Sequence, residues 1–226
     1  RNYSFRNPSA RLYELGRTYF KRPDGLADEP KVLSLGAYGE GYDFFTLKGA
    51  VETVLDGLRI PAARYVADRE NPSYHPGRCA KVYVGDKCLG TLGQIHPHVA
   101  ANYGVDCELY AAELDFAALL SVMGPDPVYQ PLPRFPAVSR DIAVVCDRAI
   151  PVGDLEDCIR RGAKGLLKAV ELFDIYTGIG VPEGKKSVAF RLTLRSDDRS
   201  LTAEEADTDV KSVLAALESE LGARLR

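Results

Sequence analysis

The sequence predicts an α+β protein with two domains, each built on a mainly antiparallel sheet. At 226 residues the chain is longer than most single domains. Five prolines fall within Met123–Pro136, where they remove amide donors and favour an extended, stiff backbone. We therefore place one domain at residues 1–125, a proline-rich linker at 126–136 and a second domain at 137–226.

Strand-like segments outnumber helices in the first domain. Gly85-Asp86 is a two-residue turn signal, so Ala80–Ile95 should form a hairpin. Apolar residues at helical spacing predict a long helix over Asp43–Leu58, and short helices should follow Pro97 and Asp115. The predicted strands are Leu12–Phe20, Lys31–Tyr38, Ala63–Ala67, Cys79–Val84, Cys88–Ile95 and Glu108–Leu114.

The second domain has the predicted order βαββαβ, which is that of a split βαβ, or ferredoxin-like, sandwich. In this arrangement two helices cover one face of a four-stranded sheet and leave the other face open. Thr202 and Glu205 fit a capping box at the start of the second helix. The predicted strands are Arg140–Cys146, Ala169–Thr177, Lys186–Arg195 and a short one at the terminus, and the helices are Val152–Lys164 and Thr202–Leu221.

Alternation along these strands assigns side chains to the two faces of the sheet. The apolar series from Val188 and from Ile142 should face the helices. On the strand Ala169–Thr177, Phe173 and Ile175 should also point inward. The open side would then hold Leu172, Asp174 and Tyr176, with Asp141, Ala143 and Val145 from one neighbouring strand, Ser187, Ala189, Arg191, Thr193 and Arg195 from the other, and Lys185 and Lys186 at the rim.

An aromatic ring, a carboxylate, a hydroxyl and cations on one face suit an unpaired nucleic-acid base. The ring offers a stacking platform, the carboxylate and hydroxyl can read a base edge, and the cations can meet phosphate. The alternative is a solvated sheet face whose polar residues have no such role. Periodicity alone does not decide between these two interpretations.

Composition narrows the classes of function. A net charge of −3 argues against a protein that coats nucleic acid by bulk electrostatics. No apolar run is long enough to span a bilayer, and no signal peptide is visible. The cysteines form no CxxC pair, which favours reduced thiols in a cytoplasmic protein.

No catalytic or metal-binding motif stands out. His96 and His98 flank Pro97, which should aim the two rings apart, and no third ligand has suitable spacing, so these residues and His75 should hydrogen-bond locally. A nucleophile elbow, an HExxH pair and a phosphate loop are all missing from the sequence. The residues alone therefore favour a binding protein without a metal or cofactor of its own.

Several motifs resemble those of one known family. "PRFPAVSRDIAVV", "FDIYTG", "GKKSVAFRLTLRS" and "DRSLTAEEAD" are similar to the ferredoxin-fold anticodon-binding domain at the C-terminus of the bacterial phenylalanyl-tRNA synthetase beta subunit. Upstream, "LYELGRTY", "YDFFTLKGAVETVL", "YHPGRCAKVYVGDKCLGTLGQIHP" and "ELDFAALL" resemble, in the same order, the catalytic-like domain of that subunit. The resemblance covers nearly the whole chain.

This resemblance implies a division of labour between two subunits. The alpha subunit of the family holds the site that adenylates phenylalanine with ATP and magnesium. Residues 1–125 would form part of a class II synthetase-like domain that has lost catalysis and packs against the alpha subunit, with the helix Asp43–Leu58 as a candidate for the buried face. The chain alone would be a non-catalytic C-terminal piece of a phenylalanine-tRNA ligase.

The resemblance also implies roles for single residues. The positions that contact guanine, the first anticodon base of tRNA for phenylalanine, correspond to Ala143, Asp174, Tyr176 and Ser187. Tyr176 would stack, Asp174 and Ser187 would meet the base edge, and Ala143 would give a backbone contact. Lys185, Lys186, Arg191 and Arg195 are phosphate candidates by charge only. Rival interpretations are a ferredoxin-like regulatory module that senses a small ligand and a protein-interaction scaffold.

Overall fold

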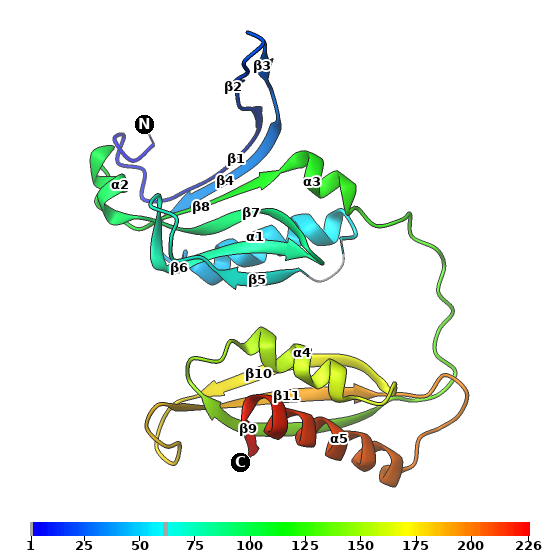
Figure 1. Ribbon diagram of the computed structural model, residues 1–226. Helices are drawn as coiled ribbons and strands as arrows, with labels where there is room; N and C mark the ends of the chain where they lie inside the picture. Colours follow the sequence, from blue (N-terminus) through cyan, green and yellow to red (C-terminus); the bar gives the residue numbers. More distant parts are fainter. Residues whose placement is uncertain (1, 61–62) are drawn as a thin grey trace. The chain divides into compact units, whose positions relative to one another are not determined.

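The computed structural model describes residues 2–60 and 63–226 (Figure 1). The chain divides into two compact units, residues 1–127 and 128–226, and each has its own hydrophobic core. Residues 123–137 form neither helix nor strand. Both sheets that carry these cores are antiparallel, so the predicted α+β class is confirmed.

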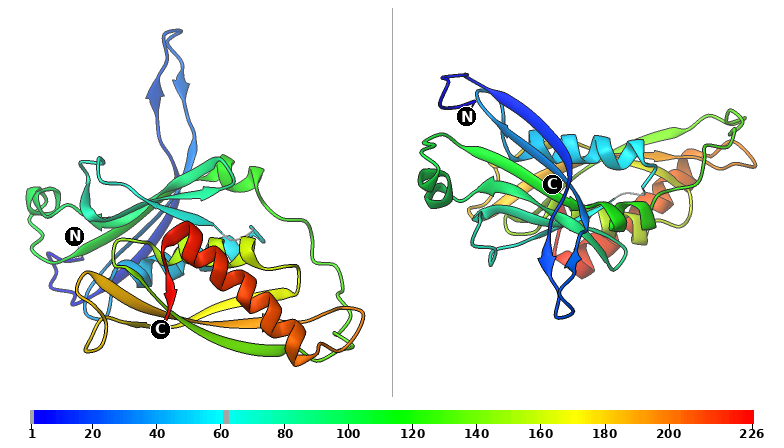
Figure 2. Two further views of the ribbon diagram at one scale, coloured as in Figure 1. Left: turned by 60° about the horizontal axis from the view of Figure 1, so that its bottom comes forward. Right: turned by 90° about the horizontal axis from the view of Figure 1, so that it is seen from above.

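The first unit is built on a six-stranded sheet in the order β1-β4-β8-β7-β6-β5. Strands β6 and β7 form the predicted hairpin, which turns at Gly85 and Asp86. A narrow ribbon that includes β2 and β3 continues β1 and β4 beyond the sheet (Figure 2). The strands are β1 Ala10–Arg17, β2 Phe20–Lys21, β3 Ala27–Asp28, β4 Lys31–Tyr38, β5 Arg64–Ala67, β6 Tyr74–Val84, β7 Lys87–Ile95 and β8 Leu109–Asp115.

Helices α1, Phe44–Gly57, and α3, Phe116–Ser121, pack into the core on one face of this sheet. Asp43 accepts the Thr46 amide at 2.7 Å and so caps α1 at the predicted start. The buried stripe of α1 consists of Leu47, Val51 and Leu55, which is the helical spacing that predicted the element. The short helix α2, Pro97–Asn102, also lies where the sequence predicts it.

The second unit has the predicted βαββαβ order and the sheet order β10-β11-β9-β12. Helices α4 and α5 both cover the same face of this sheet (Figure 1). The apolar series of β11 faces them and is fully buried, as predicted. The elements are β9 Val138–Asp147, α4 Val152–Gly162, β10 Leu167–Tyr176, β11 Lys185–Leu194, α5 Ala203–Leu221 and β12 Arg224–Leu225.

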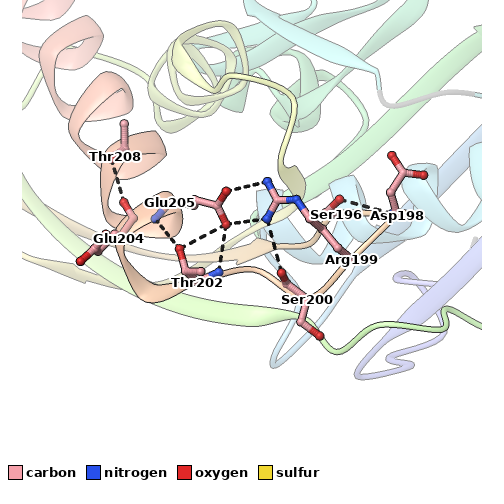
Figure 3. Close-up of polar contacts among 8 residues, drawn as sticks. All are labelled: Ser196, Asp198, Arg199, Ser200, Thr202, Glu204, Glu205 and Thr208. Atoms are coloured by element: carbon pink, nitrogen blue, oxygen red, sulfur yellow. Dashed lines mark hydrogen bonds and ion pairs between the residues drawn. The ribbon is translucent and has the colours of Figure 1, made fainter.

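The predicted capping box opens α5 (Figure 3). The Glu205 amide donates to Thr202 Oγ1 at 3.3 Å, and the Thr202 amide donates to Glu205 Oε2 at 3.0 Å. Arg199 binds the same carboxylate from outside the helix. Hydrogen bonds from Arg199 and from the Thr202 amide lower the pKa of Glu205 to about 2.

Candidate functional site

The face of the second sheet opposite α4 and α5 carries the predicted site, and we call it the open face. Residues directly opposite each other on antiparallel strands project to the same face. One row across the sheet runs Asp174–Ala189–Ala143, and a second runs Tyr176–Ser187–Val145–Arg224. The four residues Ala143, Asp174, Tyr176 and Ser187 therefore share the open face, as alternation predicts.

A β-bulge in β10 changes the assignment of two neighbouring residues. The register shifts between Leu172, which lies opposite the buried Phe190, and Asp174, which lies opposite Ala189. Leu172 therefore faces the helices and Phe173 the open face, so both predictions were wrong. The extra residue of a bulge interrupts the two-residue period on which those predictions rested. Ile175, opposite Val188, faces the helices as predicted.

Asp174 and Tyr176 differ in how they are held. The Asp174 carboxylate is exposed and, within residues 2–60 and 63–226, makes no hydrogen bond or ion pair. The Tyr176 hydroxyl donates to the Ile179 carbonyl at 3.3 Å. Gly178 permits this packing, because a Cβ there would lie 2.3 Å from the Tyr176 hydroxyl oxygen. The open face thus carries the Tyr176 ring, which is fixed by a hydrogen bond, and the Asp174 carboxylate, which has no partner among the described residues.

Arg226 also belongs to the open face. Its amide donates to the Ala143 carbonyl at 2.9 Å, which continues the pairing of β12 with β9. Its guanidinium carbon lies 5.4 Å from the centre of the Tyr176 ring. Because β9 and β11 separate β12 from β10, the Arg226 side chain must reach across the face. Arg226 was not among the predicted site residues, although the predicted terminal strand was the signal that could have identified it.

The residues at the centre of the open face are buried. Ser187 is only 3% exposed, and Ala189 is buried as well. A base could therefore reach the Ser187 hydroxyl only if a covering side chain moved. The Ala143 carbonyl already accepts the Arg226 amide, so a backbone contact from a base at this oxygen would use its second lone pair. What Ala143 and Ala189 provide is a floor of small side chains between Asp174 and Arg226.

The predicted phosphate contacts have carboxylate partners on or beside the open face. Arg191 Nε and Nη2 bind the two oxygens of Asp141, each at 2.9 Å. These hydrogen bonds hold the pKa of Asp141 below its ordinary value. Lys185 lies 3.7 Å from Asp147, and Arg195 lies 3.7 Å from Asp197.

Lys186 was predicted to lie at the rim of the open face, and this prediction was wrong. It lies opposite Cys146, on the side of the helices. The side chain is buried, and its ammonium donates to the Ile150 carbonyl. Lys186 is therefore not accessible to a phosphate in this structure.

A pocket of about 470 Å³ adjoins the Tyr176–Arg224 row. Lys185 and Arg224 contribute cations to its lining, and Glu218 contributes an acid that lies 3.2 Å from Arg224. Val145 belongs both to this lining and to the open face. The pocket thus extends the open face with a lining that carries charges of both signs.

The side chains of His75 and His96 hydrogen-bond locally, as predicted. His75 Nδ1 accepts the Gly77 amide at 3.0 Å, and His96 Nδ1 accepts the His98 amide at 3.2 Å. The rings of His96 and His98 nevertheless stack with centres 5.1 Å apart, so the prediction that Pro97 aims them apart was wrong. Among the described residues, no group of three or more His, Cys, Asp or Glu side chains could hold a metal ion.

Comparison with known families covers both units. Residues 1–116 match the family described as phenylalanyl tRNA synthetase beta chain CLM domain. Residues 133–226 match the ferredoxin-fold anticodon binding domain. The chain belongs to the phenylalanyl-tRNA synthetase beta chain family. The resemblance seen in the sequence motifs and the ferredoxin-like fold of the second unit are thereby confirmed.

Curated relatives in this beta chain family match along the whole chain. The phenylalanine-tRNA ligase beta subunit of Clostridium tetani is 41% identical over 228 residues, which cover 100% of this chain and 29% of that protein. The beta subunit of Symbiobacterium thermophilum is 43% identical, over 95% of this chain and 25% of that protein. The chain thus spans less than a third of the length of these beta subunits. Within its described residues, no helix is long and apolar enough to cross a membrane.

Proposed function

We propose that the second unit recognises the anticodon of tRNA for phenylalanine and binds its first base, guanine, on the open face. The observation that carries this proposal is the exposed carboxylate of Asp174, which has no partner among the described residues and shares the face with the Tyr176 ring. The match to an anticodon-binding domain family supports it. A four-stranded sheet with aromatic residues on its open face is also a recurrent platform for unpaired bases.

Each residue of the proposed site has a distinct task. The Asp174 carboxylate accepts the N1 and amino hydrogens of guanine, two neighbouring donors that match its two oxygens. The Tyr176 ring stacks on the base. Ser187 adds a base-edge contact once its cover moves, and Ala143 gives clearance for the base. Lys185 and Arg195 are candidates for phosphate, and each would exchange its present carboxylate partner for the RNA backbone. Arg191 would become a candidate only if it were released from its two bonds to Asp141.

Binding of an anticodon stem-loop tests this proposal. At moderate salt, the wild type should bind the stem-loop more tightly than Tyr176→Ala, which loses a stacked base worth about 1 to 3 kcal/mol. Asp174→Asn should weaken binding of the guanine stem-loop more than binding of one with adenine at that position, because adenine lacks the N1 hydrogen. Equal affinity of the wild type and both variants would contradict anticodon recognition.

We propose that the first unit assembles with the alpha subunit rather than performing chemistry. The resemblance suggests the helix Asp43–Leu58 for this contact, but the apolar stripe of α1 is used within the unit's own core. A better candidate is the edge strand β1, where Tyr13 is 80% exposed and Leu15 is 49% exposed. They lie opposite Leu35 and Leu33, which pack against the core, and so extend apolar surface to the sheet edge.

Co-purification with an alpha subunit tests the assembly proposal. Leu15→Asp should abolish recovery of the pair, whereas Tyr103→Asp, at an exposed aromatic residue in α2's C-cap, should not. Recovery of Leu15→Asp at the wild-type level would place the interface elsewhere.

The proposed holoenzyme is a cytoplasmic phenylalanine-tRNA ligase in which ATP and magnesium act at the alpha subunit, and this chain binds no cofactor. Phenylalanine-dependent exchange of pyrophosphate into ATP should therefore require the alpha subunit. Exchange catalysed by the purified chain alone would contradict the non-catalytic role.

A further inference from the structure

Phe173 occupies a position that an uninterrupted strand would not give it. Strict alternation from Asp174 would turn its ring toward the apolar core under the helices. The bulge between Leu172 and Asp174 instead brings Phe173 out on the same side as Asp174. Phe173 is 50% exposed on this edge strand. Bulges recur where a strand must redirect a side chain for function.

The surroundings of Phe173 hold its ring in place. The guanidinium carbon of Arg191 lies 5.4 Å from the ring centre. Arg191 is itself fixed, because it binds both oxygens of Asp141 from the neighbouring strand. An aromatic ring that is held by a fixed cation loses little freedom when a flat ligand stacks on its exposed surface.

The open face thus has two aromatic rings on β10, on either side of Asp174. Each lies near one arginine, Phe173 near Arg191 and Tyr176 near Arg226. The rings belong to residues three positions apart on one strand, and the bulge at Phe173 brings them closer than the about 10 Å that the usual rise of a strand would give. That spacing suits successive bases of an extended single strand, since sheets of this kind stack two or three bases on their aromatic side chains.

We propose that Phe173 is a second stacking platform, which binds the nucleotide next to the base held by Asp174 and Tyr176. This inference rests on the proposed anticodon recognition and adds a second base to the same site. The chemistry at Phe173 is stacking without base-edge hydrogen bonds, because Asp174 is assigned to the first base and the nearby Arg191 is bound to both oxygens of Asp141. The platform therefore favours a base at that position without selecting which one.

Titrations with three RNAs test the second platform. The first RNA is the intact anticodon stem-loop. In the second the nucleotide before the first anticodon base is abasic, and in the third the nucleotide after it is abasic. Phe173→Ala should bind the intact stem-loop about 5- to 150-fold more weakly than the wild type. One of the two abasic RNAs should bind the wild type and Phe173→Ala equally, because the stacked partner is then missing already. Phe173→Tyr should keep the wild-type affinity, and Phe173→Leu, which keeps apolar bulk without a ring, should not.

The outcomes separate this inference from the proposed function. If the wild type exceeds Tyr176→Ala in affinity but equals Phe173→Ala, anticodon recognition stands and the second platform is overturned. If Phe173→Ala leaves RNA binding intact and instead weakens recovery with the alpha subunit, the ring serves a protein contact and the inference is likewise overturned. If the wild type binds no better than Tyr176→Ala and Asp174→Asn, both proposals fail together. Tyr103→Ala, which removes an exposed ring from the first unit, is the control for loss of an aromatic side chain.

Discussion

Arg199 and Glu205 form a two-point ion pair at the N-terminus of α5, with Nη1–Oε2 at 2.7 Å and Nη2–Oε1 at 2.5 Å (Figure 3). Together with the Thr202 amide, this pair lowers the pKa of Glu205 from 4.5 to about 2. A carboxylate whose pKa is lower in the folded state than in the unfolded state stabilises the fold above the unfolded pKa. That contribution should be complete above about pH 4.5 and disappear as the pH falls toward about 2.

Unfolding measured between these pH values tests the pair. Glu205→Gln keeps an acceptor for the cap but cannot titrate, so its free energy of unfolding should change less with pH in this window than that of the wild type. Glu204→Gln, one residue away, is the matched control and should follow the wild type. Identical pH dependence of Glu205→Gln and the wild type would exclude a stabilising role for the charge.

Asp209 joins the two helices of the second unit. Its side chain is buried on α5, and its Oδ1 accepts the Lys164 amide, just beyond α4, at 2.6 Å. Asp209→Ala would leave that amide without a partner, which should cost about 1 to 3 kcal/mol. Asp209→Asn keeps an acceptor oxygen and should cost less. Hydrogen exchange of the β11 amides reports unfolding of this unit, so these amides should exchange faster in Asp209→Ala than in Asp209→Asn. Equal protection in both variants would contradict this prediction.

Sequence periodicity predicted most of the fold because each element has a local signal. The stripe Leu47, Val51 and Leu55 marks α1, and the turn at Gly85 marks the β6-β7 hairpin. Alternation also placed Asp174, Tyr176 and Ser187 on one face, since β11 keeps its period over its whole length. These features depend only on neighbours within a few residues along the chain.

The remaining features of the site depend on contacts between distant segments. The bulge at Phe173 arises in the register between β10 and β11, and the sequence of β10 alone does not mark it. Lys186 is buried because a carbonyl thirty-six residues away accepts its ammonium. Arg226 reaches Tyr176 only because the sheet order places β12 beside β9. Such features require the sheet to be assembled before they can be recognised.

The ion pair of Arg191 with Asp141 should limit how much the open face attracts RNA. A guanidinium that already binds two carboxylate oxygens gains little by meeting a phosphate, because it must give up an equivalent partner. Arg191→Ala should therefore change the salt dependence of stem-loop binding only slightly. A small change would mean that Arg191 lies on the open face but is not available to the RNA.

Asp141→Asn should make Arg191 available. The variant removes a negative charge from the open face and leaves the guanidinium without its carboxylate, so one more phosphate contact can form. For single-stranded RNA, each such contact should steepen the slope of log affinity against log salt by about 0.7. Affinity at low salt should rise accordingly, and the double variant Asp141→Asn, Arg191→Ala should lose both effects. Asp24→Asn, which removes the same charge from the first unit, is the control for net charge. An unchanged slope in Asp141→Asn would mean that Arg191 lies outside the path of the RNA backbone.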